Sequence, residues 1–121
     1  MLSIQHRLTK REDFNLVYKQ GHYVACDGIA LKFLKTNHAV SRLGFPVGKN
    51  YSKKATARNR IRRLLREGAR KHLPSLNPSY DLVILLNPKN SPTTFAEIAS
   101  VLEKLFSKAN LLTKSASQTK K

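Results

Sequence analysis

The sequence predicts an α+β fold, a single-domain α/β sandwich in which one four-stranded sheet packs against helices. Three observations lead to this prediction. The chain has 121 residues, 40% of them hydrophobic, which is enough to bury one core. Apolar residues recur at helical spacing in three segments, and two of these segments open with a capping-box pattern. Shorter apolar stretches between them have the period of strands, so the expected element order is αβββαβα.

The first helix is expected to begin at a capping box formed by Thr9 and Glu12, in which each side chain would bond to the other residue's backbone amide. Gly21 stands where a residue in the left-handed conformation would end this helix. Phe14 and Tyr18 share one side of the helix. Two interpretations stay open for them: they belong to the core, or they form a platform on which nucleic-acid bases stack.

Two strands are expected at residues 23–26 and 29–35, joined by a tight turn. In the second strand, Lys32 projects from a face whose other side chains are apolar. Such a lysine either attracts an anion or protects an edge strand from aggregation. A third strand is expected at 43–47, and the proline within it argues for an edge position or an early end.

The most continuous apolar run, residues 80–86, is typical of a strand covered on both faces. A second capping box, Thr94 with Glu97, opens a final helix that is less basic than the others, so we assign this helix to packing. The folded domain is expected to span residues 1–112. The polar and basic residues 113–121 have nothing to bury and are interpreted as a disordered tail.

The helix between the third and fourth strands has an apolar side and a strongly basic side. Arginines at 58, 62 and 66 repeat every four residues, which places their guanidinium groups about 6 Å apart, close to phosphate spacing. From Lys49 to Lys71 there are ten Lys or Arg residues and one acid, so the helix cannot neutralise its own charge. We interpret this side as a surface for a sugar-phosphate backbone. The expected nucleic-acid contacts on this side of the helix and just before it are Lys49, Lys53, Lys54, Arg58, Asn59, Arg62, Arg63, Arg66 and Arg70.

The overall charge points to the same class of partner. The formal net charge is +16, with 23 Lys and Arg residues against seven acids, and nucleic acid is the usual polyanion that relieves such self-repulsion. No apolar run approaches the roughly 20 residues of a membrane-spanning helix, and the N-terminus lacks the apolar middle region of a signal peptide. We therefore expect a cytoplasmic protein with no membrane partner.

The residues that could carry catalysis are few and scattered. Metal-ion nucleases need clustered carboxylates, whereas the acids here are spread along the whole chain. The four histidines show no spacing that would pair them for acid–base catalysis. The sequence therefore predicts a protein that binds nucleic acid and contributes no catalytic residue of its own.

The run Arg-Asn-Arg-Ile-Arg-Arg-Leu-Leu-Arg-Glu at 58–67 resembles the signature of the protein subunit of bacterial ribonuclease P. The preceding segment 43–49 and the N-terminal segment 7–21 are similar to that family as well, and the resemblance extends over about residues 7–110. It implies a left-handed β-α-β crossover. The generic rule for such connections expects a right-handed one.

In that family a large RNA is the catalyst, and it uses bound magnesium ions (Mg2+) to hydrolyse the phosphodiester at the 5′ end of the mature tRNA sequence. The resemblance therefore implies an RNA-binding subunit of an endoribonuclease, with the catalytic RNA of ribonuclease P and precursor tRNA as partners and Mg2+ held chiefly by the RNA. A structural RNA-binding module, such as a ribosomal protein, is the alternative.

The resemblance also implies roles for particular residues. Phe14, Tyr18 and Lys32 match positions that line the family's central cleft, where the single-stranded 5′ leader lies. Some members carry an aromatic residue where this chain has Lys32, which favours a phosphate contact there over base stacking. The family's arginine motif, which faces the catalytic RNA near its active centre, is matched by Arg58, Asn59, Arg60, Arg62, Arg63 and Arg66.

Overall fold

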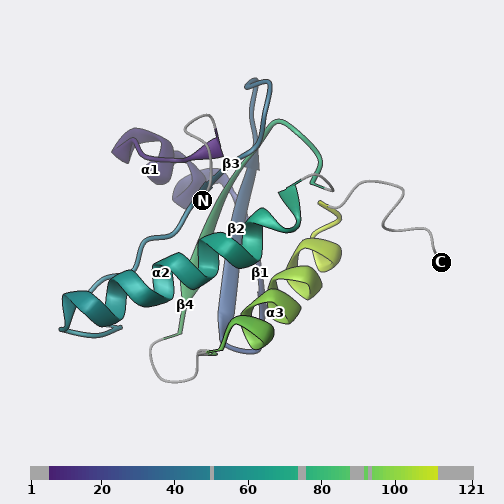
Figure 1. The fold of residues 1–121 in the computed structure, drawn as a ribbon. Coiled ribbons are helices and arrows are strands. Elements are labelled where there is room, and N and C mark those ends of the chain that lie inside the picture. Colours follow the sequence, from purple (N-terminus) through teal and green to yellow (C-terminus); the bar gives the residue numbers. More distant parts are fainter. Residues whose placement is uncertain (1–5, 50, 74–75, 88–91, 93, 112–121) are drawn as a thin grey trace.

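The computed structural model describes residues 6–49, 51–73, 76–87, 92 and 94–111. Within them the elements follow the predicted order αβββαβα (Figure 1). They are α1 (Arg11–Gln20), β1 (His22–Cys26), β2 (Ile29–Lys35), β3 (Arg42–Gly44), α2 (Ala55–Arg70), β4 (Tyr80–Leu86) and α3 (Phe95–Lys108). The predicted tail, 113–121, lies outside the described residues, and the domain boundary at residue 112 stays a prediction.

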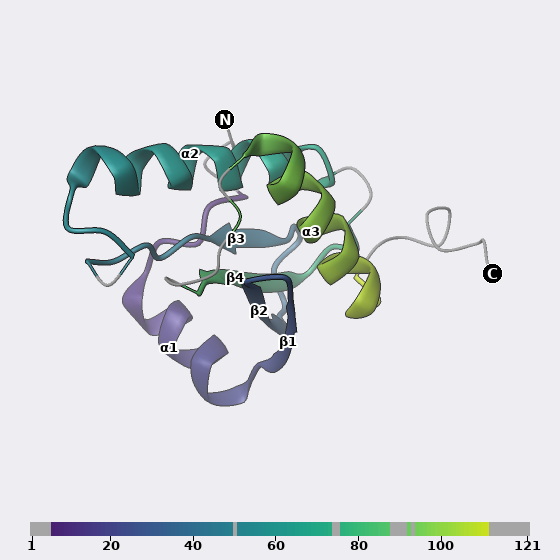
Figure 2. The same cartoon turned by 90° about the horizontal axis from the view of Figure 1, so that it is seen from below.

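The four strands form one mixed sheet in the order β1-β2-β4-β3. Strands β1 and β2 and strands β2 and β4 pair antiparallel, whereas β3 and β4 pair parallel. Strand β4 is therefore internal, as its continuous apolar sequence predicts. Helices α2 and α3 lie on one face of the sheet and α1 lies on the other, which gives three layers (Figure 2).

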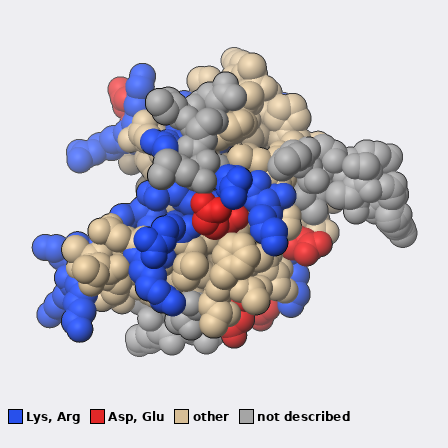
Figure 3. All heavy atoms as spheres, in the orientation of Figure 1, with Lys and Arg blue, Asp and Glu red and all other residues tan. Residues whose placement is uncertain are grey.

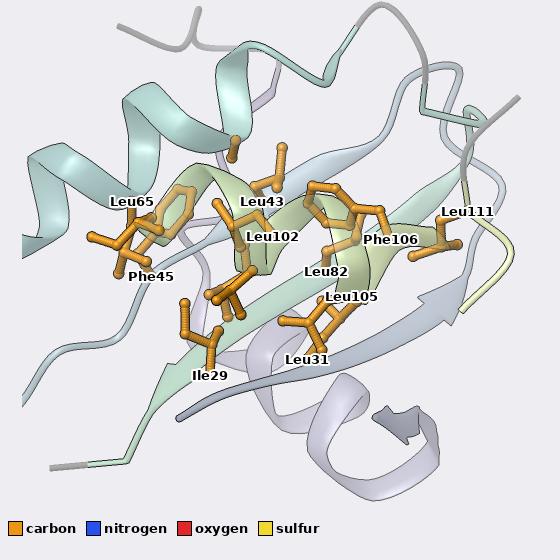
Figure 4. Packing of buried hydrophobic residues seen from close by; sticks show 14 of the residues in the cluster. Ile29, Leu31, Leu43, Phe45, Leu65, Leu82, Leu102, Leu105, Phe106 and Leu111 are labelled. Carbon is orange, nitrogen blue, oxygen red and sulfur yellow. The ribbon is translucent and has the colours of Figure 1, made fainter. Parts of the chain in front are cut away.

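Both faces of the sheet have a buried apolar cluster. The main core lies between the sheet and the α2–α3 layer, where Leu65, Leu102 and Phe106 meet Leu43 and Leu82 of the sheet (Figure 4). The cluster beneath α1 is smaller and consists of Leu8, Val17 and Val83. The sheet and the α2–α3 layer therefore form the more stable part of the fold, and α1 is an addition to the opposite face.

Strand β3 and the connection after it position the basic helix. Because β3 and β4 are parallel neighbours, the chain between them must cross over, and α2 lies in that crossover. Its left-handedness stays a prediction. Strand β3 lies at the edge of the sheet, as expected, but it ends at Gly44 rather than at residue 47. Phe45 and Val47 are still buried, while Pro46 cannot donate a ladder hydrogen bond.

The two predicted capping boxes have different outcomes. At α3 the box is present: Thr94 Oγ1 accepts from the Glu97 amide at 3.3 Å, and Glu97 Oε1 accepts from the Thr94 amide at 3.4 Å. At α1 the prediction of a Thr9 cap is wrong. The amides of residues 13 and 14 donate to the Lys10 carbonyl, so the N-cap is Lys10 and Thr9 lies one residue too early to cap.

Two glycines are needed for close packing. The prediction of a left-handed stop at Gly21 is wrong, because its φ is −74°. A Cβ at Gly21 would instead lie 2.5 Å from the Val17 carbonyl oxygen, so only glycine fits at the end of α1. On the buried side of α2, a Cβ at Gly68 would lie 3.2 Å from Leu102 Cδ1, and its absence lets α2 and α3 approach closely.

Candidate nucleic-acid interface

The arginines at 58, 62 and 66 flank the buried side of α2, and two of them are tied to the segment that leads into the helix. Arg58 Nη1 donates to the Ser52 carbonyl at 2.9 Å. Arg62 Nη2 donates to the Val47 carbonyl at 3.2 Å, and its Nη1 donates to Asn59 Oδ1 at 2.8 Å. Since these acceptors are uncharged, both guanidinium groups keep their full positive charge for a ligand.

Arg66 is partly buried and lies close to two other positively charged side chains. No hydrogen bond or ion pair joins it to the residues that the structure describes. Partial burial lowers the pKa of Arg66, and the nearby positive charges of Arg62 and Arg7 lower it further. The side chain stays protonated at neutral pH, so an anion bound here would relieve the repulsion among three guanidinium groups.

The remaining basic positions lie on the outer surface. Figure 3 shows Lys and Arg side chains gathered over α2 and around its N-terminal end. Arg70 is partly neutralised, because its Nη2 lies 2.9 Å from Glu67 Oε1. The others that the sequence singled out are exposed, namely Lys49, Lys53, Lys54, Asn59, Arg60 and Arg63. The structure therefore separates an outer basic surface from the partly buried side chains of Arg58, Arg62 and Arg66.

A pocket of about 250 Å³ is lined by residues of both α1 and α2. Its walls include Phe14 of α1, Arg62 and Arg66 of α2, and Arg7 from the segment before α1. The ring of Phe14 lies directly on the backbone of Gly44 in β3: a Cβ there would be 2.5 Å from Phe14 Cζ. An aromatic face and several guanidinium groups thus share one concave site, which sequence spacing treated as two separate features.

Tyr18 and Lys32 extend this site along α1. The ring centroids of Phe14 and Tyr18 are 6.4 Å apart, and Tyr18 is 37% exposed. Lys32 Nζ lies 5.7 Å from the centre of the Tyr18 ring and donates to the Tyr18 carbonyl at 3.2 Å. Burial raises the pKa of Tyr18, so its phenol is neutral at physiological pH. Phe14 is half-buried against Gly44, whereas Tyr18 is exposed and lies outside the residues that line the pocket.

The position of Lys32 decides between its two interpretations. Strand β2 pairs with β1 on one side and with β4 on the other, so it is an interior strand. The interpretation of Lys32 as an edge-strand lysine is therefore wrong. Its ammonium group lies on the face of the sheet that α1 covers, near the C-terminal end of that helix. There it donates to a carbonyl of the last helical turn, and it can still bind an anion.

Sequence reasoning missed the residue that joins α1 to the sheet. Arg42 of β3 donates two hydrogen bonds to Asp81 of β4, and its Nη1 lies 3.4 Å from Asp13 Oδ2 of α1. The hydrogen bond to Asp81 raises the pKa of Arg42 above its ordinary value. The signal for this contact is Asp81 itself, because a carboxylate inside a buried apolar run needs a positively charged partner.

Comparison with known proteins decides the family. A family model described as Ribonuclease P matches residues 2–110 of this chain. The chain belongs to the ribonuclease P protein family. The ribonuclease P protein component of Cyanothece sp. is 33% identical over 129 aligned positions, which cover 93% of this chain and 98% of that protein. That of Clostridioides difficile is 32% identical over 105 positions, which cover 86% and 91%.

Solved structures of this ribonuclease P family share the fold. The Staphylococcus aureus RNase P protein matches with a TM-score of 0.79 and 27% identity, over 89% of this chain and 98% of that one. The Thermotoga maritima RNase P protein matches with a TM-score of 0.75 and 29% identity, over 84% and 96%. The α+β architecture and the element order of the chain are thus those of ribonuclease P proteins.

Four acidic residues of this ribonuclease P family member are paired with basic side chains. Within the described ranges, no group of three or more His, Cys, Asp or Glu side chains could hold a metal ion. Asp13 and Asp81 face Arg42, Glu67 pairs with Arg70, and Asp27 pairs with Lys104. In the part of the chain that the structure describes, no helix is long and apolar enough to cross a membrane.

Proposed function

We propose that this protein is the RNA-binding subunit of ribonuclease P and helps a catalytic RNA remove the 5′ leader from precursor tRNA in the cytoplasm. The observation that carries the proposal is the pocket in which Phe14 lies beside Arg62 and Arg66. A single strand of RNA offers both bases for the aromatic ring and phosphates for the guanidinium groups. Membership of the ribonuclease P family supports this assignment.

The two parts of the surface have different tasks in this proposal. The basic surface binds phosphates of the catalytic RNA near its active centre, through Lys49, Lys53, Lys54, Arg58, Asn59, Arg60, Arg62, Arg63, Arg66 and Arg70. The cleft beneath α1 binds the leader: bases stack on Phe14 and Tyr18, and Lys32 contacts a phosphate. Arg62 and Arg66 border both surfaces, so leader and catalytic RNA meet at α2.

The protein contributes charge and orientation, and the RNA contributes the chemistry. Hydrolysis of the phosphodiester uses Mg2+ bound chiefly by the RNA partner, because the carboxylates of this chain are scattered and several are paired with Arg or Lys. The arginines reduce the repulsion between two polyanions that must come together, the catalytic RNA and precursor tRNA. A low magnesium concentration, which screens this repulsion least, should therefore reveal the protein's contribution most clearly.

The test is cleavage of a precursor tRNA at low magnesium by the catalytic RNA of a bacterial ribonuclease P. The reaction is run with the RNA alone, with the RNA and this protein, and with the protein alone. Stimulation of the RNA, with no cleavage by the protein alone, is the expected result. If the protein binds the RNA but does not stimulate cleavage, the proposal fails and the structural RNA-binding module becomes the better assignment.

A further inference from the structure

A row of three side chains runs from α1 onto the sheet: Tyr18, Lys32 and Tyr23. In the antiparallel pairing of β1 with β2, Tyr23 lies directly opposite Lys32, so both side chains project from the same face of the sheet. Helix α1 packs against β2 and β4 on this face, whereas Tyr23 and Ala25 of β1 are exposed there. Tyr23 is consequently 60% exposed, the highest value among the large hydrophobic side chains that the structure describes as exposed.

A pocket of about 460 Å³ opens beside Tyr23, and we call it the hairpin pocket. Ala25 of β1 and Ala30 of β2 are paired residues in its floor, and Leu85 of β4 pairs with Ala30 and forms a wall. Because the two alanines are small, the sheet is hollowed between the larger side chains of Tyr23 and Leu85. The pocket has the size and the largely apolar floor of a small-ligand site.

The turn between β1 and β2 closes one end of the hairpin pocket. Asp27 has φ of 46° and Gly28 has φ of 88°, the left-handed pair of values that a two-residue hairpin turn requires. The turn is fastened on the far side of the sheet, because Asp27 Oδ2 lies 3.5 Å from Lys104 Nζ of α3. This exposed ion pair partly offsets the negative charge of the carboxylate at the pocket wall.

We infer that the hairpin pocket binds a base of the single-stranded leader next to the base on Tyr18, with Tyr23 as its stacking side chain. This inference rests on the proposed function. Two observations favour RNA over an apolar peptide. Lys32, whose ammonium group lies 5.7 Å from the centre of the Tyr18 ring, is the strand partner of Tyr23 and can contact a phosphate that joins adjacent nucleotides, and the chain carries a net charge of +16. The row Tyr18, Lys32, Tyr23 thus alternates base and phosphate positions.

The experiment measures the affinity of the holoenzyme, reconstituted with a bacterial catalytic RNA, for precursor tRNAs that carry one abasic nucleotide at each leader position in turn. Tyr23→Ala should weaken binding of the intact leader roughly 5- to 150-fold, the range expected for one stacked base. At one leader position the abasic substitution should weaken the wild-type complex and leave the Tyr23→Ala complex unchanged. Tyr23→Phe, which keeps the ring, should behave like the wild type.

A second variant tests the pocket without touching the tyrosine. Ala25→Ile fills the floor, suits a strand, and replaces an exposed side chain, so the fold should tolerate it. It should weaken binding at the same leader position as Tyr23→Ala. Leu16→Ala on α1 is the matched control, because Leu16 is also an exposed apolar residue, 43% accessible, and lies outside the row.

The outcomes separate this inference from the proposed function. If Tyr18→Ala loses leader affinity while Tyr23→Ala and Ala25→Ile keep it, the hairpin pocket is not a base site and the leader cleft stands. If none of the three variants changes the preference for a leader over mature tRNA, both the inference and the leader-binding role are wrong. Coupling of both hairpin variants to one leader position, distinct from the position coupled to Tyr18, would support the inference.

Discussion

Arg42 in the edge strand β3 donates two hydrogen bonds to Asp81 in the central strand β4, from Nε at 2.9 Å and from Nη2 at 2.7 Å. Asp81 is only 3% exposed, so its carboxylate is shielded from solvent where it pairs with Arg42. The third nitrogen of the same guanidinium group faces Asp13 of α1 at 3.4 Å. The side chain of Arg42 thus links the edge strand β3 to the central strand β4 and to helix α1.

Replacing Arg42 by Ala should destabilise the protein by about 3 kcal/mol, because it leaves the buried carboxylate of Asp81 without a partner. Urea unfolding followed by circular dichroism measures the change. Arg42→Lys is the control: it keeps the charge but cannot form two parallel hydrogen bonds, so its loss should be smaller. An unchanged urea midpoint for Arg42→Ala would show that the pair does not stabilise the fold.

Replacing Arg58, Arg62 and Arg66 together by Ala should weaken binding to the catalytic RNA and lower its salt dependence. Each lost phosphate contact should reduce the slope of log K against log salt concentration by about 0.7 to 0.9. A triple variant that binds weakly with an unchanged slope would rule out phosphate contacts by these arginines. Lys104→Ala, an exposed cation on α3, is the control and should leave the slope nearly unchanged.

Substituting Phe14 or Tyr18 by Ala should reduce affinity for precursor tRNA with a leader and leave affinity for mature tRNA unchanged. Loss of one stacked base corresponds to roughly 1–3 kcal/mol. Binding of both RNAs to the reconstituted holoenzyme is measured in parallel. Equal losses on both would return these residues to a purely structural role, a possibility that is real for Phe14 because its ring packs on Gly44.

Gly44→Ala should displace the Phe14 ring, because the new Cβ would lie 2.5 Å from Cζ and 2.6 Å from Cε1. We expect a loss of about 1–2 kcal/mol in stability, typical of overpacking, together with weaker leader binding. The same substitution made in a Phe14→Leu background should cost less, since the clash is removed. Additive stability losses in the double variant would show that the two residues do not interact as the structure describes.

Features that depend on local sequence were predictable. The run 80–86 is the interior strand that its apolar composition indicated, and Thr94 caps α3 as its spacing with Glu97 required. The Thr9 cap failed for a reason that spacing cannot reveal, since a shift of one residue in the helix start leaves the same pattern. Local sequence rules therefore located the ends of these elements to within about three residues.

Features that depend on contacts between distant segments were not predictable from spacing. The site residues Phe14 and Arg66 are 52 positions apart, and only the packing of α1 and α2 around β3 brings them to one pocket. Spacing along the sequence did not assign Arg7 or Tyr23 to this site. The register of β1 with β2, which places Tyr23 opposite Lys32, follows from the two-residue turn, so the hairpin pattern could have located Tyr23.

The small cluster of Leu8, Val17 and Val83 has a consequence for the motions of the molecule. Amide hydrogens of α1 should exchange with solvent through a local opening of lower free energy than those of β4 and α3, which share the extensive cluster on the other face. The helix that carries Phe14 and Tyr18 is then the part that detaches most readily. A bound strand of RNA would slow this exchange selectively. Contacts of the leader with α1 would then stabilise the helix on the sheet, where its own packing is small.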